Sequence, residues 1–187
     1  DNEIAWIDWN LGREQEQLLE FAGHVVDLRK QHPVFRRRRF FRGSADHGGQ
    51  SDLHDIVWLR VDGTEMVEED WKTGYARTLA VFFNGDAIFE PGPLGQRVRD
   101  DHFILLFNAH SEPVDFKISG VAEGVRWLEA VNTDLPTGIP APGSQPHQAG
   151  DVLTLAGRSV VVLRSEEIPQ DVQAADAQAE QAEQVAE

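Results

Sequence analysis

The sequence predicts a mainly β protein: an antiparallel β-sandwich preceded by one amphipathic helix. Two observations carry this prediction. The first is a series of short apolar or alternating segments after residue 54, separated by turn residues. The second is a single long segment with helical periodicity, which comes before all of these strands. A sandwich is favoured because the strand-like segments can bury two inner faces against each other.

The helix is expected over residues 11–31. Its apolar positions recur at spacings of three and four, and they are Leu18, Phe21, Ala22, Val25 and Leu28. Pro33 ends the helix, and Arg29 and Lys30 in its last turn complement the helix dipole. Such a helix must bury its apolar stripe against something, yet the sequence offers no second helix as an obvious partner.

The sheet is expected to form around the stretch HFILLFNAHSEPVDFKI, residues 102–118. Residues 103–107 are a short continuous apolar run, which favours a central strand buried on both faces. Residues 114–118 alternate between apolar and polar, as a half-buried strand does. The polar connection contains Asn, Ser and Pro, which are typical turn residues, so the two strands are predicted to form a hairpin.

The remaining elements follow from the same signals. Further strands are predicted at residues 55–61, 79–84 and 125–131, and a final pair at residues 152–155 and 159–163. A short acidic helical turn is predicted within residues 64–71, and residues 135–150, rich in Pro and Gly, are expected to form a long loop. Trp127 is predicted to belong to the core rather than to a binding surface.

The charge balance restricts the kinds of partner. Lys and Arg number 17 against 32 Asp and Glu, a net charge of −15, which argues against nucleic acid or an anionic membrane as partner. The exception is residues 35–42, FRRRRFFR, where pairing of the arginines with carboxylates is preferred over phosphate binding. Residues 166–187 contain seven acidic residues and no basic one, so a disordered tail is expected there.

Residue spacing alone predicts no catalytic site. The sequence shows no nucleophile elbow, phosphate loop, zinc pattern or convincing carboxylate pair. His47 and His54 lack metal-ligand spacing, so neither a metal nor a cofactor is expected. Trp6 and Trp9 could stack on a sugar ring, although packing against a neighbouring element is the preferred interpretation.

Five motifs in order carry a more specific signal. They are DNEIAWIDW, the helix with LLEF and LRKQHPVFRRRRFF, WLRVDGTEMVEEDW, LAVFFNGDAI and LLFNAHSEPVDF. Together, over about residues 1–165, they resemble the C-terminal part of bacterial glycogen debranching enzymes of the isoamylase type, in the α-amylase superfamily.

The resemblance implies a division of the chain. Residues 1–35 would be the end of a (β/α)8 barrel, its loop and last helix, whose remainder is absent from the chain. Residues 36–77 would be a connecting segment with one strand, and residues 78–165 the C-terminal β-sandwich domain. Residues 166–187 would be the acidic tail.

The resemblance also implies a function. The whole enzyme would be a cytoplasmic hydrolase that cleaves α-1,6 branch linkages of glycogen or limit dextrin during glycogen catabolism, without a cofactor. Its catalytic carboxylates would lie upstream, so this chain would hold none and would be inactive alone. Asp1 and Asn2, at the end of a loop on the catalytic face, are expected near the bound glucan.

Two questions stay open at this stage. The oligomeric state is one, and association into a homo-oligomer is compatible with the sequence. The other is an alternative function as a stand-alone glycan-binding or protein-interaction β-sandwich module. That function would need exposed aromatic residues in a row, whereas the tryptophans are scattered over several elements: Trp6, Trp9, Trp58, Trp71 and Trp127.

Overall fold

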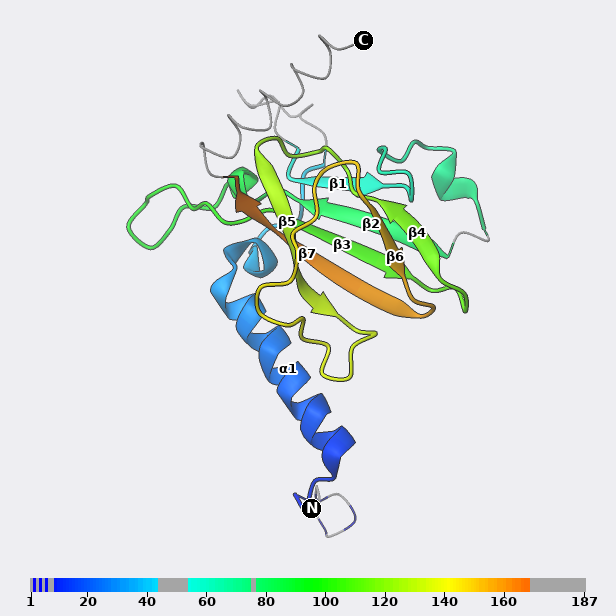
Figure 1. Cartoon of the computed structure of the whole chain (residues 1–187). Coiled ribbons are helices and arrows are strands. Elements are labelled where there is room, and N and C mark those ends of the chain that lie inside the picture. Colours follow the sequence, from blue (N-terminus) through cyan, green and yellow to red (C-terminus); the bar gives the residue numbers. More distant parts are fainter. Residues whose placement is uncertain are drawn as a thin grey trace.

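The computed structural model contains one α-helix and seven strands in the residues it describes (Figure 1). The described residues are 2, 4, 6, 9–43, 54–74 and 77–168. The elements are α1 (Arg13–Gln31), β1 (Ile56–Leu59), β2 (Thr78–Phe83), β3 (Phe103–Asn108), β4 (Val114–Lys117), β5 (Val125–Asn132), β6 (Val152–Leu155) and β7 (Ser159–Glu167). Three short 3-10 helices join them: η2 (Pro33–Arg36), η3 (Asp70–Lys72) and η4 (Gly85–Ala87).

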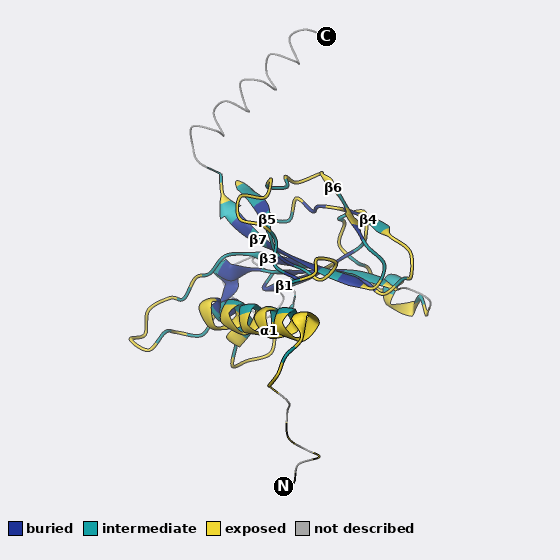
Figure 2. Ribbon diagram, turned by 60° about the horizontal axis from the view of Figure 1, so that its bottom comes forward, coloured by how far each residue is buried: buried dark blue, intermediate teal, exposed yellow. Residues whose placement is uncertain are grey.

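The strands form two antiparallel sheets. The larger sheet has the order β1-β2-β3-β7-β5, and the smaller one consists of β4 and β6. β3 is the middle strand of the larger sheet, as its apolar run predicts. Figure 2 shows the small sheet on one side of the large sheet and α1 on the other. The mainly β, sandwich-like fold with one N-terminal helix is therefore confirmed.

The core between the sheets is built from alternating strand residues. Ile104 and Leu106 from the large sheet meet Phe116 from the small one, and all three are buried. Trp127 lies in the same cluster, completely buried and edge-on to Phe82 at 6.4 Å between ring centroids. The prediction that Trp127 is a core residue is confirmed.

The two predicted strand pairs, 103–107 with 114–118 and 152–155 with 159–163, are wrong. β3 pairs with β2 and β7, whereas β4 pairs with β6 in the other sheet. The side chain of Asn108 explains the crossing, because its amide donates to the carbonyl oxygens of Glu112 and Ala156, both at 2.9 Å. These bonds hold the chain at a corner between the two sheets. The chain therefore passes from the large sheet to the small one between β3 and β4, and back again between β6 and β7.

Other elements differ from expectation only at their ends. The predicted acidic helical turn is reduced to η3, and residues 135–150 contain no strand or helix, as predicted. β7 extends to Glu167, two residues into the predicted tail, and residues 169–187 lie outside the described residues.

No helix within the described ranges is both long enough and apolar enough to cross a membrane.

The outer face of the large sheet carries a second apolar cluster. Phe103, Val131 and Val162 are its buried members from the sheet, and Phe21 and Leu28 of α1 pack against them. The helix predicted at residues 11–31 is confirmed, and within the described residues its partner is the sheet rather than a second helix. The sheet itself supplies a docking surface for one side of the helix.

Candidate functional site

The C-terminal end of α1 is tied to the sandwich by one buried carboxylate. The Nδ1 atom of His32 lies 2.7 Å from Oδ1 of Asp100, and the backbone N–H of Val34 donates to Oδ2 of the same residue at 2.9 Å. The His32 ring also contacts Phe103 edge-on, with ring centroids 4.8 Å apart. Sequence reasoning missed this link because nothing local connects His32 with a residue 68 positions away.

The middle of α1 is seated by one hydrogen bond and one tight packing contact. Nε2 of His24 donates to the carbonyl oxygen of Ala130 at 2.8 Å. Phe21 lies directly on Gly138, where an added Cβ atom would stand 2.4 Å from Cδ2 of the ring. The helix is thus fixed to β5 and to the loop that follows it, and Gly138 could have been recognised from the sequence only as a turn residue.

The outward side of α1 is apolar too. Four large apolar side chains there are exposed: Leu18 at 65%, Leu19 at 54%, Val25 at 39% and Val26 at 49%. With 3.6 residues per turn, they occupy one continuous arc next to the docked side. Figure 2 shows this outward side as mostly exposed. The helix therefore has a second apolar face that the described part of the chain does not cover.

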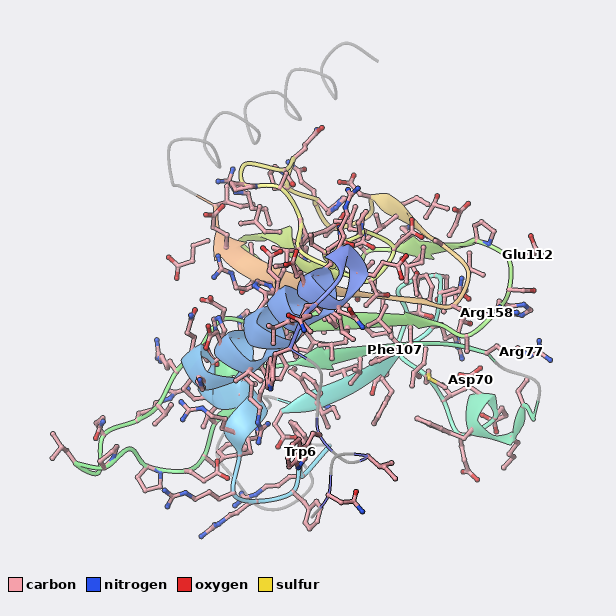
Figure 3. The ribbon with its side chains drawn as sticks, turned by 90° about the horizontal axis from the view of Figure 1, so that it is seen from below. Trp6, Asp70, Arg77, Phe107, Glu112 and Arg158 are labelled. Carbon is pink, nitrogen blue, oxygen red and sulfur yellow. The ribbon has the colours of Figure 1, made fainter. Side chains whose placement is uncertain are left out.

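The predicted substrate-binding residues precede this helix. Asp1 lies outside the described residues. Asn2 is exposed, and its Oδ1 accepts from the backbone N–H of Ile4 at 3.2 Å, which is a local turn contact. Trp6 lies in the same segment (Figure 3), and both it and Trp9 are exposed rather than packed inside the fold.

A groove of about 540 Å³ lies between α1 and the loop at residues 139–146. Its size is within the usual range of ligand pockets. Its three carboxylates, however, are engaged: Glu166 forms an ion pair with Arg126 at 2.6 Å, Asp27 forms one with Lys30 at 3.3 Å, and Glu129 lies 3.3 Å from Nε2 of His147. The contacts of Glu166 and Glu129 connect β5 with β7 and with the loop that contains His147. The groove is therefore explained by the docking of α1 on the sheet rather than by acid–base chemistry.

One further cluster of titratable groups is formed by His32, Asp100 and Asp101. Both oxygens of Asp100 are already used to hold the end of α1. Asp101 faces Arg164 at 3.8 Å. The cluster therefore explains the attachment of α1, and its geometry supplies neither a free nucleophile nor a free acid for glycoside hydrolysis.

Comparisons with known proteins show which family has this architecture. Residues 55–164 match the family described as isoamylase, C-terminal. A protein of Mycobacterium tuberculosis called glycogen operon protein GlgX homolog is 42% identical over 164 residues, which cover 88% of this chain and 22% of that protein. An isoamylase of Pseudomonas amyloderamosa is 21% identical over 171 residues, covering 88% of this chain and 20% of that protein.

The chain therefore spans only about a fifth of the length of these curated relatives. The family match, by contrast, covers more than half of the chain and includes all seven strands except the end of β7. The chain belongs to the isoamylase C-terminal domain family.

Proposed function

We propose that this chain is the C-terminal part of a glycogen debranching enzyme that hydrolyses the α-1,6-glucosidic branch linkages of glycogen. The observation that carries the proposal is the family match combined with a helix that is docked on the sandwich by one side only. The relatives' names, GlgX homolog and isoamylase, support a branched α-glucan as the substrate of the whole protein.

The two-faced helix is what the last helix of a (β/α)8 barrel would look like. Phe21 and Leu28 face the sandwich, while Leu18 and Val25 are left for a second apolar neighbour. Neighbouring exposed apolar side chains of this kind are typical of an interaction site. We assign that neighbour to the remainder of the barrel, so that α1 joins the two domains.

The domain division that follows is the one implied by the resemblance. Residues 1–35 complete the barrel, residues 36–77 connect it to the sandwich, and residues 78–165 form the C-terminal domain. Residues 166–187 form an acidic extension. Catalysis would use a nucleophile and a general acid/base from the barrel strands, in a cytoplasmic enzyme of glycogen catabolism. The role of this chain is then to hold the last barrel helix in place.

The proposal predicts different activities for the chain and for a longer protein. The 187 residues alone should release no linear glucan from glycogen, because the chain would contain no catalytic carboxylate pair. A protein extended at the N-terminus to the length of the relatives should debranch glycogen. Chromatography of the released chains measures both. Debranching by the 187 residues alone would contradict the proposal.

One observation favours the alternative of a stand-alone glycan-binding module. Trp58 and Trp71 form an edge-to-face pair with ring centroids 5.4 Å apart, and their exposures are 37% and 55%. Asp70, which carries an ion pair to Arg60 at 2.8 Å, lies beside Trp71. A flat apolar face flanked by polar groups suits a sugar ring. The two rings stand at 85° to each other and so share no flat platform, and the uncovered face of α1 has no role in such a module.

The N-terminal segment gives a separate prediction. In the longer protein, replacing Asp1 and Asn2 by Ala should raise the KM for branched glucan, because these residues would lie on the loop above the catalytic face. Steady-state kinetics on glycogen measures the change. Arg13→Gln is a suitable control, since Arg13 lies beyond the loop in α1. Unchanged kcat and KM in the double variant would exclude both residues from substrate contact.

A further inference from the structure

The four consecutive arginines at positions 36–39 are not equivalent in the structure. Arg37 is turned inward, with 6% of its side chain exposed, and pairs with Asp55 at 3.0 Å. Its Nη2 donates to the carbonyl oxygens of Asn84 and Ala87. Its Nε, also buried, has no hydrogen-bond partner among the described residues.

The other three arginines are exposed. Within the described ranges, Arg36, Arg38 and Arg39 form no ion pair with any carboxylate. The expectation that carboxylates neutralise this cluster is therefore correct for Arg37 and wrong for its three neighbours. In a chain of net charge −15, three exposed guanidinium groups within four positions, without an ion pair among the described residues, form a segregated basic surface.

These arginines line a cavity of about 690 Å³. The opposite wall is an ordered loop containing Ile88, Glu90, Pro91, Gly92, Pro93 and Val98. The loop is closed by a hydrogen bond from the N–H of Gly92 to the carbonyl oxygen of Gln96 at 2.8 Å. Glu90 is held by the backbone N–H of Arg39 at 3.0 Å. The groove thus has one basic wall and one largely apolar, proline-rich wall.

We propose that this groove binds a phosphate monoester, with Arg36, Arg38 and Arg39 contacting the phosphate oxygens. A guanidinium group is always charged and presents a planar fork of donors that matches phosphate geometry. The proline wall suits the ring of a sugar or a base attached to the phosphate. This inference does not depend on the debranching activity.

The test is a binding measurement on the 187-residue chain. Isothermal titration calorimetry with inorganic phosphate, glucose 1-phosphate and AMP should show binding of at least one, weakened by salt. Stronger binding of glucose 1-phosphate than of phosphate would assign the second wall to a sugar, and stronger binding of AMP would assign it to a nucleotide. Either result supports the site.

Variants locate the binding. Arg38→Gln with Arg39→Gln should weaken it by about tenfold or more, since charge-assisted hydrogen bonds are lost. The matched control is Arg13→Gln with Arg77→Gln, two exposed arginines outside the groove whose loss changes the net charge equally. The double variant Arg38→Lys, Arg39→Lys keeps the positive charge but lacks the planar fork of guanidinium donors. Its affinity should lie between those of the unchanged chain and the double Gln variant.

Three results would overturn the proposal. One is equal weakening in the groove and control variants, which would indicate only a general charge effect. Another is full binding by the Arg38→Gln, Arg39→Gln variant. The third is an absence of binding by all three phosphate compounds, including the case in which an oligo-glutamate peptide binds instead and assigns the groove to an acidic protein surface.

Discussion

Replacing Asp55 by Asn should lower the free energy of unfolding by about 3–5 kcal/mol, because it removes the carboxylate paired with the buried Arg37 guanidinium. The side chain of Asp55 is 1% exposed. Its carboxylate accepts hydrogen bonds from Nη1 of Arg37 and from the backbone N–H groups of Arg42 and Gly43, each at 3.0 Å. Burial lowers the pKa of Arg37, and the Asp55 carboxylate opposes that shift. Without the Asp55 carboxylate, burial is opposed only by the more distant charge of Glu90, which forms no ion pair with Arg37 among the described residues.

Urea unfolding followed by tryptophan fluorescence measures this change. Asp115→Asn is the matched control, because Asp115 is exposed and, among the described residues, its carboxylate accepts a single hydrogen bond, from its cross-strand neighbour Thr154 at 2.6 Å. That variant should cost less than about 1 kcal/mol. Equal losses of unfolding free energy in the two variants would show that the buried Arg37–Asp55 pair stabilises the fold no more than an exposed hydrogen bond does.

The strands could be predicted because their signals are local. An apolar run of five residues was enough to identify β3 as a central strand, and alternation was enough for β4. Their pairing could not be predicted in the same way. The corner after β3 depends on Asn108 reaching Ala156, 48 residues away, and no local pattern distinguishes such a corner from a hairpin turn.

The functional surfaces show the same division. The basic run was visible in the sequence, but which arginine is neutralised depends on where the fold places Asp55. The apolar stripe of α1 was also visible, yet its division into a docked side and an open side depends on the shape of the sheet beneath it. Local composition identifies a candidate surface, whereas the tertiary fold decides which part of it stays available.

Replacing Gly138 by Ala should loosen α1 from the sandwich. Gly138 has a φ of +66°, and an added Cβ would stand 2.4 Å from the Phe21 ring. The left-handed backbone costs a non-glycine residue about 1–2 kcal/mol. Overpacking against Phe21 adds about 1–3 kcal/mol. Because η2 and the Asp100 contacts hold only the end of the helix, the strain should be relieved by movement of Phe21 and its turn.

Gly143 provides the control for the conformational cost of placing a non-glycine residue at a positive φ. It lies in the same loop with a φ of +79°, but an added Cβ there would meet no atom within 4 Å. Gly143→Ala should therefore carry the conformational cost without the contact. Hydrogen exchange should show faster exchange at the amides of residues 21–28 in Gly138→Ala than in Gly143→Ala. Similar exchange in the two variants would mean that the Phe21 contact does not hold the helix. If α1 is the last barrel helix, the same Gly138→Ala change in the longer protein should weaken the junction between barrel and sandwich.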